Sequence, residues 1–200
     1  MKQDYPPLVT PKWLRKKLEA KPANLRILDA SWHLSYTNRN ALAEFREDHI
    51  PEAQFFDIDE CCDKSDSSVS HMLPTAEFFA EYVGKLGIDN DSHVVIYDNN
   101  STFGLFSAPR AWWTFKVMGH DKVSILDGGF PKWMEDTEQL ATDEIPKHKP
   151  VKFEVNFRSE MVKSFGEVER NLQTKEFQLV DARPAGRFAG ISPEPRPGEN

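Results

Sequence analysis

Short apolar runs alternate with amphipathic stretches along most of the chain. The runs rich in Val, Ile, Leu and Phe predict buried strands at residues 26–30, 53–58, 93–98, 122–129 and 177–182. Helical patterns between them begin at Thr10, Thr75 and Ser107, and Pro11 suits a first helical position. Branched apolar strands that alternate with helices are typical of a parallel sheet covered on both faces. We therefore predict an α/β fold with a central parallel sheet flanked by helices.

An internal repeat suggests how the chain is divided. At an offset of 152 residues, "WLRKKLEAKPANLRILDA" from Trp13 aligns without a gap with "FGEVERNLQTKEFQLVDA" from Phe165. Between the two, "EDTEQLATDEIPKHKPVKFEVNF" carries prolines among charges, which is typical of a connector. We predict a first domain over residues 8–140, a linker over 141–160 and the start of a second, similar domain over 161–200. The alternative is two unrelated helix–strand units.

The charges and the cysteines exclude several classes of protein. The chain has 25 basic and 32 acidic residues, interspersed and without a basic stripe, which argues against a nucleic-acid partner. No apolar run is long enough to cross a bilayer and the first residues lack a secretory signal, so we expect no membrane partner and a cytoplasmic location. The only cysteines are Cys61 and Cys62, which favours a reducing compartment. Because no Cys or His pair has ligand spacing, we predict no metal.

The stretch "VVIYDNNSTFGLFSAPRAWWTF" predicts a strand, a polar loop and a helix. A loop between the carboxyl end of a strand and the amino end of a helix is where α/β proteins bind anions and hold nucleophiles. This loop has no cysteine, no Gly-Lys-Ser/Thr and no Gly-x-Ser-x-Gly. The pattern therefore predicts an anion cradle without a nucleophile, which begins at Asp98.

Four motifs together resemble the tandem-domain rhodanese family, closest to the 3-mercaptopyruvate and thiosulfate sulfurtransferases. They are "FREDHIPEAQFFDID", "HMLPTAEFFAEYVGKLGI", the stretch from Val94 to Trp133, and "VDARPAGRFAGISPEPRPG". The resemblance covers nearly all of residues 10–198. It implies two α/β domains, of which the second takes sulfur from 3-mercaptopyruvate or thiosulfate as a cysteine persulfide and passes it to a thiol or cyanide. It implies no cofactor, and it implies a small-molecule sulfur donor and a thiol acceptor, such as a thioredoxin-like protein, as partners. It also adds the mitochondrion as a location.

The resemblance makes Asp98 the counterpart of the nucleophile in the other domain. The loop after Tyr97 is then a degenerate copy, and its aspartate would repel the anionic donor that the active loop attracts. The nucleophilic cysteine is expected in a part of the second domain that this chain does not contain. We therefore expect no catalytic nucleophile in these residues and no turnover by the chain alone.

Two residue pairs are candidate supporting sites. By resemblance, Asp59 and His71 form a pair in which the carboxylate orients the imidazole for proton transfer, facing a serine of the catalytic loop; the alternative is a solvent-facing or capping histidine. By resemblance, Arg187 and Arg196 match the family's substrate-binding arginines. Arginine suits this role because its guanidinium fork matches carboxylates and sulfur oxyanions. The alternative for these arginines is pairing with nearby glutamates or solvent.

A second class of function stays open. The chain could be a non-catalytic rhodanese-like module that binds a protein partner or regulates a longer relative, and an exposed apolar face would favour it. A rhodanese-related phosphatase is a more distant alternative, because such enzymes also need a loop cysteine.

Overall fold

The computed structural model describes residues 5–65, 70–102, 104–137 and 145–193. It separates into two compact units, Met1–Met161 and Val162–Asn200.

The first unit is built on a five-stranded sheet with the strand order β1-β5-β4-β2-β3. Every neighbouring pair is parallel, so all strands end at the same edge of the sheet. The strands are β1 (Leu8–Val9), β2 (Leu25–Asp29), β3 (Ala53–Phe55), β4 (His93–Tyr97) and β5 (Val123–Leu126). The predicted fold class is confirmed, and four of the predicted strands form close to their expected positions. The two-residue edge strand β1 was not predicted, because it is too short to leave a pattern.

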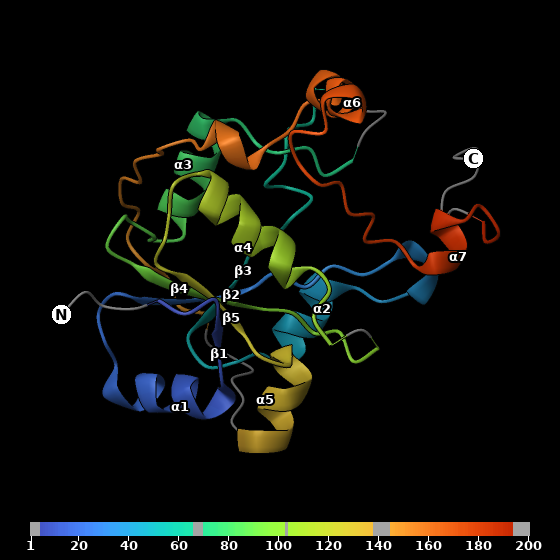
Figure 1. Cartoon of the computed structure of the whole chain (residues 1–200). Coiled ribbons are helices and arrows are strands. Elements are labelled where there is room, and N and C mark those ends of the chain that lie inside the picture. The colour runs from blue at the N-terminus through green and yellow to red at the C-terminus, as the bar shows by residue number, and fades with distance from the viewer. Residues whose placement is uncertain (1–4, 66–69, 103, 138–144, 194–200) are drawn as a thin grey trace. The chain divides into compact units, whose positions relative to one another are not determined.

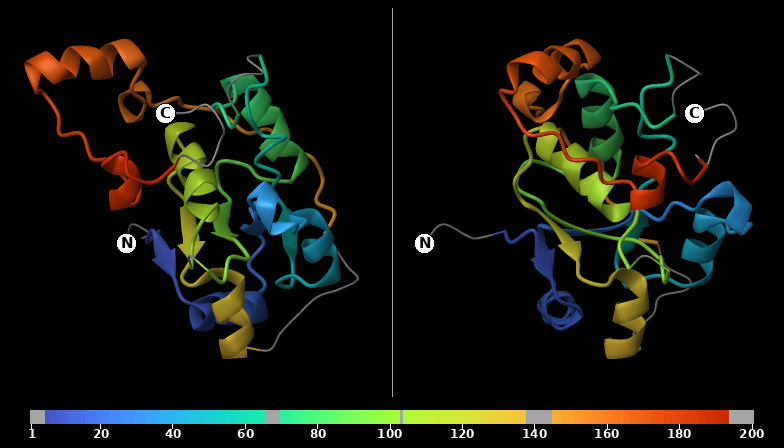
Figure 2. Two further views of the ribbon diagram at one scale, coloured as in Figure 1. Left: turned by 90° about the vertical axis from the view of Figure 1, so that its right-hand side faces the viewer. Right: turned by 45° about the vertical axis from the view of Figure 1, so that its right-hand side comes forward.

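Helices cover both faces of this sheet, as Figures 1 and 2 show. They are α1 (Pro11–Ala20), α2 (Ala41–Glu47), α3 (Ala76–Lys85), α4 (Ala108–Val117) and α5 (Gly129–Thr137), with 3-10 turns η1 (Ser35–Thr37) and η2 (Ser159–Met161). Helices α3 and α4 lie on one face, and α1 and α5 lie on the other. Side chains alternate along each strand, so β4 contributes to the apolar layers on both faces of the sheet. Val94 and Ile96 pack with α3 and α4, whereas Val95 and Tyr97 pack with α1 and α5.

The helix starts follow from local hydrogen bonding. The Thr10 hydroxyl accepts from the Trp13 N–H at the start of α1, and the Thr75 hydroxyl caps α3 in the same way. Both helices begin where the sequence predicts. Helix α2 begins after Asn40, whose side chain caps it. It was not predicted, because seven residues are too few to establish a helical period.

The motif "LDGGFPKW" turns the chain back toward the core after β5. Gly128 and Gly129 both have positive φ angles, which glycine adopts at little cost. A Cβ on Gly129 would lie 2.4 Å from the carbonyl oxygen of Asp98, so the close approach also requires glycine. Trp133, on α5, is fully buried.

Residues 151–158, which we call the strap, lie along the first unit. The Val151 N–H donates to the Gly84 carbonyl, and the Asn156 N–H donates to the Met118 carbonyl, both at 3.0 Å. Phe153 is buried in the cluster formed by α3 and α4. The described part of the predicted linker therefore packs on the first unit rather than standing free of it.

Glycine lets the strap approach closely. A Cβ on Gly84 would lie 2.5 Å from the Val151 carbonyl oxygen, and one on Gly119 would lie 2.4 Å from the Asn156 carbonyl oxygen. At the end of the strap, Arg158 forms two hydrogen bonds to Asp121 at 2.7 and 2.9 Å.

The second unit contains α6 (Phe165–Thr174) and the short α7 (Ala185–Phe188). A capping box between Ser164 and Glu167 begins α6. The predicted strand at residues 177–182 is wrong: these residues carry no strand, and Leu179 and Val180 are exposed. A strand needs a neighbour for its backbone hydrogen bonds, and no strand of the described second unit supplies one.

Phe153→Ala tests whether the strap contributes to folding. We expect the free energy of unfolding to fall by about 3 to 5 kcal/mol, because an aromatic side chain is removed from a packed cluster. Urea denaturation followed by circular dichroism measures the change. Phe157→Ala, in the same strap but 47% exposed, is the matched control and should change stability by less than about 1 kcal/mol. Equal losses in the two variants would show that the strap is not anchored through Phe153.

Candidate functional site

The loop between β4 and α4 is closed around the side chain of Asp98. Asp98 is 1% exposed. Its Oδ2 accepts three backbone N–H bonds, from Phe106 at 2.8 Å, Ser107 at 2.8 Å and Ala108 at 2.7 Å. These are charge-assisted hydrogen bonds of the kind that bound anions receive at helix starts. The sequence predicted an anion cradle with nothing in it, whereas in the structure the cradle is filled by its own aspartate.

The start of α4 explains why the cradle needs this carboxylate. Ser107, the residue before the helix, makes no side-chain cap. Pro109 has no N–H, and the Arg110 N–H donates to the Ser107 carbonyl. The Ala108 N–H is therefore satisfied by Asp98 alone among the bonds described. The Asp98 carboxylate, ten residues before Ala108, therefore caps the helix in place of Ser107.

A second buried acid, Asp29, lies at the end of the neighbouring strand β2. The Ser31 N–H donates to Asp29 Oδ1 at 2.8 Å, and the nearby Tyr97 hydroxyl favours the ionised form of the same carboxyl group. Burial, with a smaller contribution from the nearby Asp98 carboxylate, raises the pKa of Asp29 to about 7 against the lowering effect of Ser31 and Tyr97. Two acids therefore share one end of the sheet interior.

Asp59 and His71 lie together at the same edge of the sheet. His71 Nε2 is 2.7 Å from Asp59 Oδ1. A carboxylate oxygen only accepts, so we assign the imidazole proton to Nε2, which leaves Nδ1 as the nitrogen that can accept a proton. The Asp59 side chain is 61% exposed and that of His71 is 23% exposed. Solvent reaches both side chains, and the pair was expected from the family resemblance rather than from the local pattern.

Trp32 is a part of this site that the sequence did not reveal. Its indole N–H donates to Asp59 Oδ2 at 3.1 Å, so both carboxylate oxygens are occupied. Its ring meets the His71 ring edge-on, with centroids 5.0 Å apart. The contacts join Trp32 to residues 27 and 39 positions away, and no spacing along the chain signals them.

Two further contacts hold the His71 loop. His71 adopts a positive φ of 60°, and the loop is closed by a bridge between Asp63 and Met72. The Arg110 guanidinium donates to the His71 carbonyl and lies over the Trp113 ring. A side chain of α4 therefore holds the backbone of the His71 loop.

Neither cysteine has the environment of a nucleophile. Cys61 is buried, and this burial raises its pKa to about 12. Burial also raises the pKa of Cys62, although Lys64 lies nearby. A thiol with a raised pKa holds little thiolate at neutral pH. The surroundings of both cysteines therefore disfavour the thiolate.

The arginines of the second unit are placed only in part. Arg187 lies in α7 and is half-buried, and its charge acts on Asp181. Asp181 itself is held by Arg183, at 2.7 Å. Arg196 lies outside the described residues. The role of the two candidate arginines in substrate binding stays a prediction.

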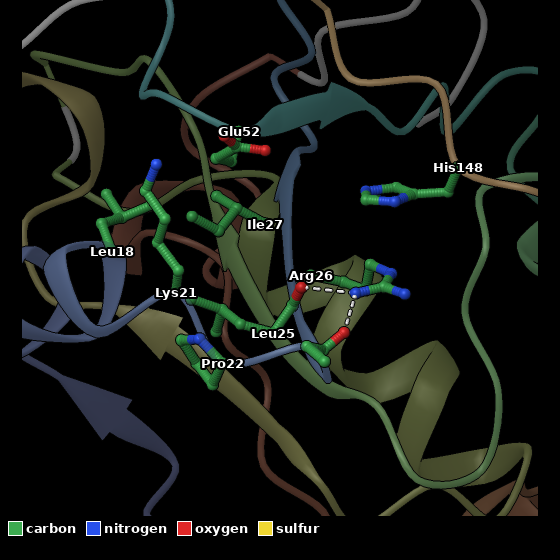
Figure 3. Close-up of a pocket in the computed structure, with 9 residues that line it drawn as sticks. Leu18, Lys21, Pro22, Leu25, Arg26, Ile27, Glu52 and His148 are labelled. Atoms are coloured by element: carbon green, nitrogen blue, oxygen red, sulfur yellow. Dashed lines mark hydrogen bonds between the residues drawn. The ribbon is translucent and has the colours of Figure 1, made fainter.

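A cavity of about 250 Å³ opens at the other end of the sheet, where β2 begins. Figure 3 shows Lys21, Arg26, Glu52 and His148 around it. Arg26 is held by carbonyl oxygens, including that of Gly87 at 2.8 Å. Burial and the Arg26 charge lower the pKa of His148. This cavity is separated from Asp59 and His71 by the length of the strands.

The described residues contain neither a metal-binding cluster nor a membrane-spanning helix. No group of three or more His, Cys, Asp or Glu side chains gathers there in a way that could hold a metal ion. None of the helices in the same residues has the length and apolar character that crossing a membrane requires.

Comparison with known proteins assigns the family. A family model described as rhodanese-like domain matches residues 10–136. The chain therefore belongs to the rhodanese family, as the motifs predicted.

Its relatives are sulfurtransferases. The chain is 45% identical to the 3-mercaptopyruvate sulfurtransferase of Homo sapiens and 46% identical to the thiosulfate sulfurtransferase of Bos taurus. Each match covers 96% of this chain and 64% of the relative. Among solved structures, the Escherichia coli 3-mercaptopyruvate sulfotransferase SseA matches with a TM-score of 0.81 at 35% identity, over 91% of this chain and 67% of that one. The Tum1 protein of Saccharomyces cerevisiae matches with a TM-score of 0.82 at 31% identity, over 98% and 66%.

Asp29→Asn tests the buried acid through the pH dependence of stability. Well below pH 4 the natural carboxyl is protonated in both folded and unfolded chains. As the pH rises toward 7, the unfolded chain loses this proton while the folded chain keeps it, so the free energy of unfolding falls. The asparagine variant lacks this loss, and its stability relative to the natural chain should rise by up to about 4 kcal/mol between pH 4 and 7.

Urea denaturation at several pH values measures the difference. Asp136→Asn, on the exposed side of α5, is the control and should give a curve parallel to that of the natural chain. If the Asp29→Asn curve is parallel as well, Asp29 does not hold a proton in the folded protein.

Proposed function

We propose that the chain forms the amino-terminal part of a sulfurtransferase. The enzyme would move a sulfur atom from 3-mercaptopyruvate or thiosulfate to a thiol or cyanide. The proposal is supported by the names of relatives that match 96% of this chain at 45% and 46% identity. Because the two names come with nearly equal identity, similarity does not choose between the two donors.

The observation that carries the proposal is the accessible Asp59–His71 hydrogen bond of 2.7 Å. Transfer of sulfur from 3-mercaptopyruvate to a cysteine needs one proton to move, since the thiol loses a proton and the carbon that gives up sulfur gains one. An imidazole held by a carboxylate can accept the first proton and return the second. His71 would do so through Nδ1, while Asp59 keeps the ring oriented.

The nucleophile would be a cysteine of the second domain that these 200 residues do not contain. Its thiolate would attack the donor sulfur and carry it as a persulfide. Cys61 and Cys62 are poor candidates for this step, given the raised pKa of each thiol. Arg187 and Arg196 would bind the carboxylate or the sulfur oxyanion of the donor.

The alternative, a non-catalytic binding module, also has an observation in its favour. The second unit exposes large apolar side chains, namely Phe165, Leu172, Leu179, Val180, Phe188 and Ile191. In a sulfurtransferase they would pack within a complete second domain; in a binding module they would contact a partner. Concentration-dependent dimerisation of the 200-residue chain would support the second reading.

Sulfide release tests the enzyme assignment directly. With 3-mercaptopyruvate or thiosulfate and a reducing thiol, we expect no turnover from the 200-residue chain and turnover from a form that includes the complete second domain. Intact mass after exposure to the donor should show no added sulfur on the short chain. A complete form that releases no sulfide from either donor would refute the proposal.

His71→Gln in the complete form tests the proton-transfer role. We expect kcat with 3-mercaptopyruvate to fall by about 100-fold, because general acid–base assistance is lost, with little change in KM. Glu60→Gln is the control, since Glu60 is a neighbour that pairs with Lys64 on the surface. An unchanged kcat in His71→Gln would place His71 outside the chemistry.

A further inference from the structure

The loop between β4 and α4 contains an anion of its own. We propose that the Asp98 carboxylate is the built-in anion ligand of this loop, and that it positions the Asp59–His71 pair through Phe106, Ser107 and Trp32. The inference rests on the proposed function only for what His71 then does. The positioning itself is a property of the folded 200-residue chain.

The Asp98 carboxylate is bound by backbone N–H groups of the loop. Three N–H groups converge on Asp98 Oδ2, all within 2.8 Å. The other oxygen, Oδ1, is buried and has no hydrogen-bond partner among the described residues. A buried acceptor without a donor is costly, so the bonds to Oδ2 and the start of α4 must outweigh this cost. The cradle thus holds one small anion out of water, and the chain supplies that anion itself.

Two independent contacts connect the loop to Trp32. Ser107, whose N–H donates to Asp98, accepts the Trp32 backbone N–H with its hydroxyl at 3.1 Å. Phe106, whose N–H also donates to Asp98, stacks its ring on the Trp32 ring, with centroids 6.2 Å apart and planes 22° apart. One contact therefore fixes the Trp32 backbone and the other fixes its ring.

Trp32 in turn contacts the Asp59–His71 pair. The Trp32 indole N–H donates to Asp59 Oδ2, and Asp59 Oδ1 holds His71. The Asp59 side chain is 61% exposed, so water would compete for this carboxylate if the indole were displaced. Asp98 is thus a positioning residue, and a loop without a cysteine contributes to the same site.

Asp98→Ala with sodium formate tests the proposal on the 200-residue chain. Removing the carboxylate leaves three amides around a space of about its size, which formate, itself a carboxylate, matches. We expect the thermal midpoint of the variant to rise saturably with formate. Sodium chloride at equal ionic strength should not reproduce the rise, and the natural chain should show no saturable response.

The Trp32 indole N–H resonance reports on positioning rather than on stability. Its signal is assigned by its loss in Trp32→Phe, and Asp59→Ala gives its position when the hydrogen bond is absent. In Asp98→Ala we expect the signal to move toward that position and to return when formate is added. Ile125→Val, a core change in the same unit, should lower the thermal midpoint without moving the signal and without a response to formate.

Asp98→Asn covers the case in which the alanine variant does not fold, because the amide keeps the size and one acceptor but not the charge. We expect a smaller displacement of the Trp32 signal and no response to formate, since the cradle is still filled. A Trp32 signal at the natural position in the Asp98 variants would overturn the positioning role. If formate raises the thermal midpoint of a folded Asp98→Ala chain no more than chloride does, the proposal that Asp98 is the anion ligand of the loop is overturned. Neither result depends on whether the complete enzyme transfers sulfur.

Discussion

The parallel pairing of β2 with β4 is the constraint on which the core and the site both depend. The register runs from Leu25 opposite His93 to Asp29 opposite Tyr97. Because both strands run in the same direction, the residues after Asp29 and those after Tyr97 emerge side by side. A slip of one residue would exchange the side chains of the two apolar layers and would also part Trp32 from the loop after β4. Packing and chemistry are therefore fixed by one set of backbone hydrogen bonds.

The same acidic residue type serves opposite purposes at this edge of the sheet. Asp98 is buried and bound by backbone amides, so its charge is used inside the protein. Asp59 is exposed and bound by two side chains, so its charge acts on the partly exposed imidazole of His71. Environment, rather than residue type, separates a structural carboxylate from one suited to proton chemistry.

The sequence predicted the parts of the fold that depend on local patterns. Buried strands such as β4 form continuous apolar runs, and the caps Thr10 and Thr75 announce their helices. The segment 177–182 has the same strand pattern and forms no strand, because pairing is not a local property.

The site was harder to predict for the same reason. Asp59 and His71 were found only through family resemblance, and Trp32 was not found at all. The Asp98 position was predicted, but its burial was not, because three backbone amides leave no mark in a sequence.

The close contact between the strap and α3 has a consequence for how this surface can change in evolution. Gly84 lies within α3, where alanine would ordinarily favour the helix. Here a methyl group would meet the Val151 carbonyl oxygen at 2.5 Å, so a change that improves the helix would detach the segment that covers it. Substitution at this position is limited by a backbone 67 residues later in the chain. An outer segment of irregular structure can therefore restrict the sequence of a regular helix beneath it.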